Sequence, residues 1–566
     1  MILGSAIVYP PVLPFAAETT LCPQNISLIH RWLNDCEINH PSCKKSDVRN
    51  FLPTRLICVK SDSAWLVETR QFSDSERQLA HYLALSHCWG PKTEFQYKTT
   101  SQNLSSRLQS MVFANFPQNI KDVISVCRAL GVKYLWIDSI CIIQNLPHDL
   151  AREMEVMLEV YANAHVTISA TCAASADKGF LSRTPKPGPK LNIPRQGGSK
   201  INGKDDSIVI FTEGRGLILS EMWKTQVVDS PWNQRAWTLQ EALVSPRIVY
   251  FANERLFFEC STLDCLEGAN ISRAFMSQRP NLNLQNEGNS VPINFLRQQD
   301  TLGFFHHNSE SFRMDQMYRD YYIVIERYTA RKLTFVEDRA AACSAIIEGI
   351  TRITQSPVHH GLFMSDVRQG LQWCGKYLPL FDEQERLNQW PTWSWLSYPG
   401  PVYFRSKFDS SLSEEGGMTQ IHLNDEIFRN SQTNYSGSVN KRLHLEGFLI
   451  PASIHNNTRS WAQYPVFVKG KNVCSANLDY DKPSTRHFPL QSFIFSLGET
   501  ESEKRRRKEL PAGPFAVPGQ MLVRHDETSF KRVGVCRIFG CNKSISWENE
   551  SKWILKDVQR ERIILV

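Results

Sequence analysis

The chain has 566 residues, of which 42% are hydrophobic and 21% are charged. This composition is typical of folded globular proteins, and the length predicts two or three domains rather than a single hydrophobic core. The formal net charge of +7 is small for this length, which argues against a dedicated nucleic-acid-binding protein. No apolar stretch approaches the length of a membrane-spanning helix, so we expect no membrane span.

The cysteines and one basic run bear on where the protein acts. Most of the 15 cysteines lie within apolar runs, as Cys127 and Cys141 do, and there they are typical of small buried side chains. We therefore expect a reducing, cytoplasmic compartment. The basic run at 504–508 is typical of a solvated loop, with a nuclear localisation signal as the alternative interpretation.

Residues 1–75 are expected to form an N-terminal segment with one helix and two short strands. After the helix, Cys36, His40 and Cys43 follow a C-x3-H-x2-C spacing. Thiols and imidazoles are ligands that zinc prefers, but a zinc site needs a fourth group, such as Cys22. The alternative is that these cysteines pack in the core and His40 caps the helix.

Residues 80–265 alternate between strands and helices, with an insertion rich in Pro, Gly and Lys at about 177–225. This alternation predicts an α/β domain with a parallel sheet. The expected strands are 81–86, 134–143, 165–171 and 247–260, and the expected helices are 116–131, 149–164 and 235–243.

The first three strands of this block end in small hydroxyl or acidic residues, namely Ser86, Asp138 with Ser139, and Ser169. Ligands of open parallel sheets bind beyond the carboxyl ends of the strands. We therefore expect a binding site at this edge. The alternative is that these residues cap the helices that follow, which is the favoured interpretation for Ser139 and Ser169; for Asp138 both interpretations stand.

The rest of the chain is expected to contain a helical, tryptophan-rich segment at 300–405 and a β-rich region at 436–566. Trp393 and Trp395 alternate with small or polar residues, which predicts a strand with one aromatic face. Short alternating apolar runs from residue 440 onward predict the β-rich region.

The predicted helix 235–243 places Trp237 and Glu241 four residues apart, on one helical face. Glu241 is either a catalytic carboxylate in a site walled by an aromatic such as Trp237 or Trp232, or a structural carboxylate. The structural alternative is an ion pair with Arg235 or Arg247. For Trp237 itself, packing against the sheet is the favoured interpretation.

Four blocks of the sequence resemble the fungal heterokaryon-incompatibility (HET) domain in their order and spacing; they lie at 82–90, 116–145, 161–171 and 235–260. His87 departs from the pattern, since many relatives carry tyrosine at that position. The resemblance implies a role in non-self recognition and regulated cell death, with other incompatibility proteins or a second copy of the chain as partners.

The HET domain has been likened to the Toll/interleukin-receptor (TIR) domain, which has a flavodoxin-like fold and in some members cleaves NAD. By that likeness, Trp237 and Glu241 match a helix that carries a tryptophan and, one turn later, the catalytic glutamate. It implies that NAD is a substrate, that no cofactor is required, and that Glu241 is catalytic. The expected substrate-binding residues are Ser86, Trp89, Asp138, Trp237 and Gln240.

Two alternatives to this NAD-cleaving enzyme remain. The domain could be a non-catalytic signalling module that triggers cell death through assembly or partner binding. A cysteine hydrolase would use Cys88, but the adjacent His87 points to the opposite side of an extended segment. His81 and His165 are the other candidate bases for that thiol.

Overall fold

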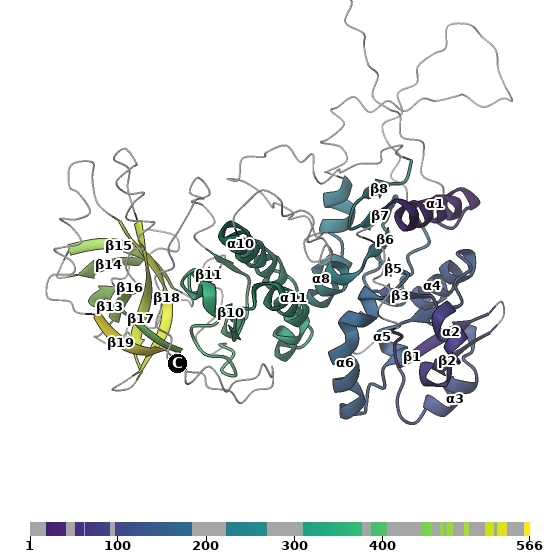
Figure 1. The fold of residues 1–566 in the computed structure, drawn as a ribbon, viewed down its shortest axis with the longest axis horizontal. Helices are drawn as coiled ribbons and strands as arrows, with labels where there is room; N and C mark the ends of the chain where they lie inside the picture. The colour runs from purple at the N-terminus through teal and green to yellow at the C-terminus, as the bar shows by residue number, and fades with distance from the viewer. Residues whose placement is uncertain are drawn as a thin grey trace, which may run out of the picture. The chain divides into compact units, whose positions relative to one another are not determined.

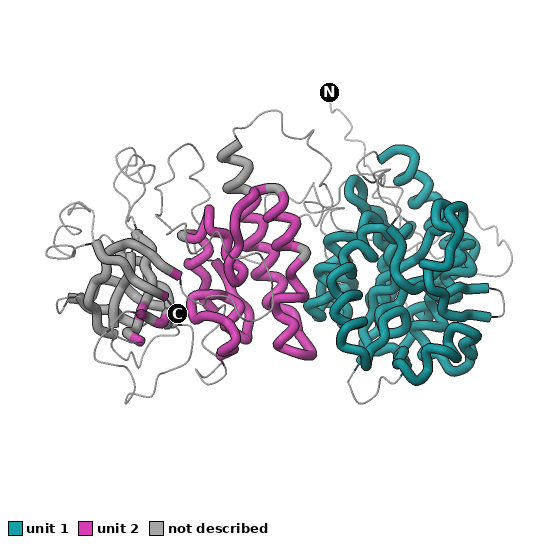
Figure 2. Tube along the Cα trace, turned by 60° about the horizontal axis from the view of Figure 1, so that its bottom comes forward, with its two compact units in different colours: residues 1–302 teal, residues 303–566 magenta. Residues whose placement is uncertain are grey.

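The chain divides into two compact units, residues 1–302 and 303–566 (Figure 2). The computed structural model describes residues 19–40, 43, 51–60, 63–90, 97–183, 222–268, 310–375, 386–404, 443–454, 464–468, 471–478, 492–496, 516–525, 529–539 and 560–565. Most of the predicted insertion at 177–225, and the basic run at 504–508, lie outside the described residues.

The first unit is built on an eight-stranded sheet with the order β2-β1-β4-β3-β5-β6-β7-β8 (Figure 1). The four central strands, β4-β3-β5-β6, are parallel, and the strands outside them pair antiparallel. The strands are β1 (Arg55–Val59), β2 (Ala64–Glu68), β3 (Tyr82–Ser86), β4 (Tyr134–Trp136), β5 (Val166–Ser169), β6 (Arg247–Phe251), β7 (Leu256–Cys260) and β8 (Asp264–Leu266).

Numbered in chain order, the four parallel strands lie in the spatial order 2-1-3-4. This is the order of the first four strands of a flavodoxin-like sheet, in which the direction of winding changes between the first and third strands. Here that switch point lies between β3 and β5. Three helices connect successive parallel strands, namely α4 (Gln118–Ala129), α6 (Pro147–Ala162) and α8 (Ala236–Val244). The α/β prediction is confirmed.

The sequence accounts for α4 from end to end. Pro117 precedes its first residue, and Ile120, Val123 and Cys127 are completely buried on its inner face. The helix is followed by Gly131, whose φ of +68° lies in the left-handed region. Glycine suits this position because other residues adopt such a conformation at a steric cost.

The N-terminal elements belong to the same unit. Strands β1 and β2 form an antiparallel pair that extends the sheet beside β4. Helix α1 (Pro23–Asn39) stacks Trp32 on Phe258 of β7, with the ring centroids 5.6 Å apart. The unit also contains three shorter α-helices, α2 (Asp74–Leu79), α3 (Leu104–Gln109) and α5 (Asp138–Cys141), besides short 3-10 and π-helical turns.

Two expected strands differ from the structure. The run 134–143 leaves the sheet at Trp136 and turns into α5, because the Asp138 carboxylate accepts a hydrogen bond from the Ser139 amide at 2.7 Å and so supports a helical turn. Residues 247–260 form two antiparallel strands, β6 and β7, since the polar residues around Asn253 make a turn between them.

The second unit contains helices α10 (Glu310–Thr329), α11 (Ser344–Thr354) and α12 (Val367–Gly370), with the buried Trp373, Trp393 and Trp395. The strand expected around Trp393 is wrong. A 3-10 turn, Trp395–Ser397, occurs instead, because the Ser394 hydroxyl accepts a hydrogen bond from the Leu396 amide at 3.0 Å. Four short strands form two antiparallel pairs, β9 (Val358–His359) with β10 (Leu362–Phe363), and β11 (Trp373–Gly375) with β12 (Val402–Phe404).

The β-rich C-terminal prediction is confirmed by a seven-stranded sheet that closes on itself, since β14 also pairs with β13, and β18 with β19 (Figure 1). Its strands are β13 (Leu443–Ile454), β14 (Tyr464–Val468), β15 (Lys471–Leu478), β16 (Ser492–Ser496), β17 (Ala516–Arg524), β18 (Ser529–Phe539) and β19 (Arg560–Leu565). Among the described residues, no helix combines the length and the apolar character needed to span a membrane.

Candidate functional site

A buried carboxylate lies at the carboxyl edge of the parallel strands. Ser86 is the last residue of β3, and its hydroxyl donates a short hydrogen bond to the carboxylate of Glu241 on α8. The Trp232 indole N–H in turn donates to the Ser86 hydroxyl oxygen at 2.6 Å. Glu241 is only 7% exposed, so these contacts replace hydrogen bonds to water that burial removes.

A second hydroxyl approaches the same carboxylate from α6. The Tyr161 hydroxyl donates a hydrogen bond to the Leu85 carbonyl oxygen at 3.2 Å, and it lies near enough to Glu241 to oppose the rise of its pKa. Leu85 is the residue before Ser86 in β3. Ser86 therefore holds Glu241 beside the end of β3, next to the switch point of the sheet, with the Tyr161 hydroxyl close by.

A half-buried group of side chains surrounds this centre. The Trp89 indole N–H lies 2.9 and 3.1 Å from the two carboxylate oxygens of Asp138, and Arg235 donates a short hydrogen bond to the His87 carbonyl. Trp89, Asp138 and Arg235 are each partly exposed, and the charges of Asp138 and Arg235 both act on Glu241. These three residues give the buried carboxylate a polar boundary toward solvent.

The protonation of Glu241 follows from this setting. Burial raises the pKa of Glu241 to about 7, while the hydrogen bond from Ser86 and the positive charge of Arg235 oppose the rise. Burial also raises the pKa of Asp138, and Arg235 again opposes the rise. A carboxyl group with a pKa near 7 exchanges its proton close to neutral pH, which is the property expected of a reactive carboxylate.

Among the predicted site residues, the structure brings together Glu241, Ser86 and Asp138: Ser86 is hydrogen-bonded to Glu241, and the charge of Asp138 acts on it. Trp89 joins this group through its hydrogen bond to Asp138. Gln240 is 2% exposed, and its side-chain oxygen has no hydrogen-bond partner among the described residues. Trp237 is half-buried and packs against the main core of the unit, as its packing interpretation predicts.

The structural alternative, an ion pair between Glu241 and either Arg235 or Arg247, is only partly supported. Arg247 is not its partner, because the three guanidinium nitrogens of Arg247 contact the Cys36 sulfur and the carbonyls of His165 and Cys43. Arg235 does act on Glu241 through its charge. Tyr161 is the residue that sequence reasoning missed; its signal was a phenol on the apolar face of a helix, where a buried hydroxyl needs a partner.

The cysteine-hydrolase alternative finds no support. Burial raises the pKa of the Cys88 thiol and lowers the pKa of His87 to about 3, so both groups are held neutral. His81 and His165 lie together, 5.5 Å between ring centroids, directly before β3 and β5 and so at the opposite edge of the sheet.

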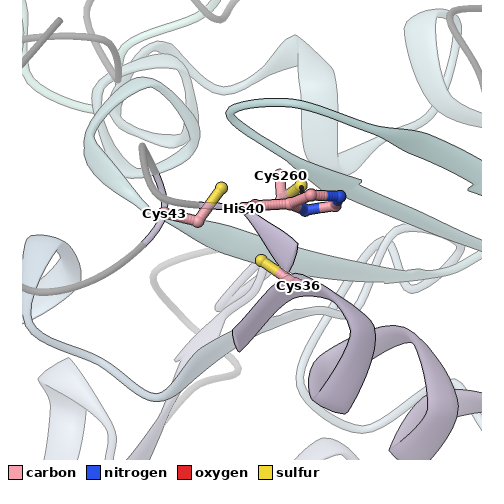
Figure 3. Close-up of side chains that lie close together, drawn as sticks. All are labelled: Cys36, His40, Cys43 and Cys260. Atoms are coloured by element: carbon pink, nitrogen blue, oxygen red, sulfur yellow. Dashed lines mark hydrogen bonds between the residues drawn. The ribbon is translucent and has the colours of Figure 1, made fainter. Parts of the chain in front are cut away.

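The predicted zinc ligands also come together at that opposite edge. Cys36, His40 and Cys43 are joined by Cys260, the last residue of β7 (Figure 3). Cys22, the suggested fourth ligand, precedes the first residue of α1 and is not part of the cluster. The sequence could not indicate Cys260, since it lies far along the chain from the other three residues.

This is an α/β domain with a flavodoxin-like strand order and a buried carboxylate at the carboxyl edge of its parallel strands. Residues 82–241, from the first residue of β3 to Glu241 itself, match the family model described as heterokaryon incompatibility protein (HET), so the chain carries a HET domain. The HET-domain resemblance found in the sequence is thereby confirmed for these residues. No curated protein matches the chain, and no solved structure matches it either.

Proposed function

We propose that this chain acts in non-self recognition and regulated cell death of the heterokaryon-incompatibility type, and that its HET domain does so by cleaving NAD. Glu241 is the proposed catalytic carboxylate. The observation that carries the proposal is the position of this group, buried at the carboxyl edge of the sheet beside the switch point, with the Ser86 hydroxyl hydrogen-bonded to it.

The proposed reaction breaks the bond between C1′ of the ribose and the nicotinamide nitrogen. The bonding pair stays with nicotinamide, which leaves as a neutral molecule because its ring is cationic in NAD. Positive charge develops on the ribose in an oxocarbenium-like transition state, as in glycoside hydrolysis. Water then adds to C1′ and releases a proton, which gives ADP-ribose.

This reaction requires a negatively charged group near the ribose, and it requires no acid to protonate the leaving group. The leaving group departs without protonation, so the ionised form of Glu241 stabilises the developing positive charge. The Ser86 hydroxyl holds the carboxylate in place, and the charge of Arg235 favours its ionised form. Asp138 offers an acceptor for a ribose hydroxyl, and the partly exposed Trp89 offers an aromatic surface beside it. Gln240, whose side-chain oxygen has no hydrogen-bond partner among the described residues, is a second proposed acceptor.

The proposal is tested by expressing the wild type and Glu241→Ala at matched levels in cells and following NAD content and viability. Glu153→Gln is a suitable control, since Glu153 is also buried but pairs with Arg152 on α6 at 3.0 Å. We expect the wild type and the control to deplete NAD and kill the cells, and Glu241→Ala to do neither.

A different outcome would favour the non-catalytic alternative. If Glu241→Ala kills cells as the wild type does while NAD stays constant, the enzymatic proposal is wrong. The domain would then trigger cell death by self-association or by binding another incompatibility protein.

A further inference from the structure

Four buried side chains from distant parts of the chain converge at the amino edge of the sheet (Figure 3). Cys36 lies in the last turn of α1, His40 follows the end of that helix, Cys43 follows three residues later, and Cys260 ends β7. We propose that Cys36, His40, Cys43 and Cys260 bind one structural zinc ion.

The distances fit this ion. The four ligand atoms all lie within 4.8 Å of one another, and the Cys260 sulfur is 3.4 Å from His40 Nδ1. Zinc–sulfur bonds of about 2.3 Å and zinc–nitrogen bonds of about 2.0 Å in a tetrahedron place neighbouring ligand atoms roughly 3.5–3.8 Å apart. A small contraction of the cluster therefore completes a tetrahedral site.

The donor set and its burial favour a structural role. Three thiolates and one imidazole form one of the common structural zinc sites, and four protein ligands leave no position open for a substrate. The exposed fractions are 0% for Cys36 and Cys260, 2% for Cys43 and 8% for His40. An ion at this position would be closed off from water.

The surrounding groups balance the charge of such a site. A zinc ion with three thiolates carries a net charge of −1, and the buried Arg247 supplies a compensating positive charge, with Nε 3.2 Å from the Cys36 sulfur. The amides of Thr262 and Leu263 donate to the Cys260 sulfur at 3.4 and 3.2 Å. Hydrogen bonds of this kind orient metal ligands and tune their basicity.

The surroundings of the His40 ring also resemble those of a zinc-bound histidine. Its Nδ1 faces Cys260, and its other ring nitrogen, Nε2, lies 3.9 Å from a carboxylate oxygen of Asp35. A carboxylate near the outer nitrogen of a histidine is a common feature of zinc sites, where it fixes the tautomer that leaves the inner nitrogen free to bind.

A metal here would connect segments that are distant in sequence. Cys36 and His40 mark the end of α1, whereas Cys260 pairs in register with Arg247 at the start of β6. The ion would fix α1 and Cys43 to the antiparallel side of the sheet, beyond the matched HET residues 82–241. It would therefore stabilise the N-terminal segment against the HET domain.

The test measures metal in the full chain, purified without chelator and after incubation with zinc chloride followed by removal of excess ion. We expect about one zinc per chain in the wild type, and little in Cys36→Ser or Cys260→Ser. Cys127→Ser is the matched control, because Cys127 is equally buried but lies in α4, outside the cluster. It should keep its zinc.

Two further measurements cover variants that fold poorly. Cys260→His keeps four ligands and should retain the metal, and cobalt exchanged into the wild type should show the absorption bands of a tetrahedral thiolate site. Wild-type protein without zinc after incubation, zinc that survives both serine substitutions, or a disulfide between two of the three cysteines would each overturn the proposal.

Discussion

Ionisable groups are buried at both edges of the first unit's parallel sheet, but the surroundings of these groups affect their charge differently at the two edges. At the carboxyl edge, Glu241 receives a hydrogen bond from the Ser86 hydroxyl, and burial raises its pKa to about 7. At the amino edge, three thiols and an imidazole converge beside a buried arginine. The first arrangement holds a carboxyl group ready to change its charge, whereas the second resembles a fixed set of metal ligands.

An arginine at each edge shows the difference most clearly. Arg235 is half-buried, and its charge acts on both Glu241 and Asp138. Arg247 is 3% exposed and is bound by two carbonyls and a sulfur. One cation therefore tunes carboxylates at a boundary with solvent, and the other neutralises a closed cluster. In the two proposals, one sheet thus separates a reactive carboxylate from a structural metal site.

Removal of the metal should have the largest effect on the stability of the protein. This effect should depend only on the proposed metal ligands at the amino edge. Loss of a structural zinc costs on the order of 5 kcal/mol or more, since metal binding and folding are coupled. We expect a strong chelator to lower the urea midpoint of the first unit in the full chain. The effect should persist in Cys127→Ser and vanish in Cys260→Ser. If the chelator lowers the urea midpoint equally in both variants, the metal is not bound by the cluster of Cys36, His40, Cys43 and Cys260.

The pH dependence of stability should report on the carboxyl edge. The folded state holds the Glu241 proton up to a pKa of about 7, compared with 4.5 for an ordinary glutamate side chain. Between these values the folded state binds more protons, so the contribution of Glu241 to stability falls as pH rises and is fully lost above pH 7. The difference amounts to about 3 kcal/mol.

Glu241→Gln removes this dependence. The free energy of unfolding, measured by urea titration from pH 4.5 to 8, should therefore fall more steeply in the wild type than in the variant. Asp138 contributes in the same direction in both proteins, because burial raises its pKa too. Parallel curves for the two proteins would show that Glu241 is not protonated in this range.

A smaller effect is expected from Ser86→Ala. The Ser86 hydroxyl donates to Glu241 and lowers its pKa, so its removal should raise that pKa further, by roughly one unit. Carboxyl titration followed by NMR in selectively labelled protein would measure the shift. Ser125→Ala is a suitable control, because the Ser125 hydroxyl bonds only the Lys121 carbonyl within α4 among the described contacts, at 2.9 Å. A Glu241 pKa that moves equally in both variants would contradict the assignment.

The contact between Ser86 and Glu241 at the carboxyl edge could be predicted from the sequence more fully than the cysteine–histidine cluster at the amino edge. Alternating strands and helices place Ser86 and Glu241 near the same edge of a parallel sheet, so their meeting followed from topology. Tyr161 was missed because its spacing on α6 matches core packing. The predicted strand 134–143 ended early because Asp138 supports a helical turn.

Cys260 could not be predicted as a metal ligand, because no local spacing links it to Cys36, His40 and Cys43. Its position depends on the hairpin of β6 and β7, which sets Cys260 opposite Arg247. The sequence also gave no sign that β1 and β2 continue the sheet of the HET domain. Ser86 and Glu241 are 155 residues apart, but the alternation of strands and helices brings them to one edge; no such alternation links Cys260 to the end of α1.

The most direct test of the central proposal is NAD cleavage by the purified full chain as a function of pH, with nicotinamide and ADP-ribose measured as products. We predict that kcat/KM rises with pH and levels off above about 7, as Glu241 ionises. Glu241→Gln should lower it by roughly a hundredfold or more. Unchanged turnover in Glu241→Gln, or no cleavage by the wild type at any pH, would contradict the assignment of Glu241 as the catalytic carboxylate.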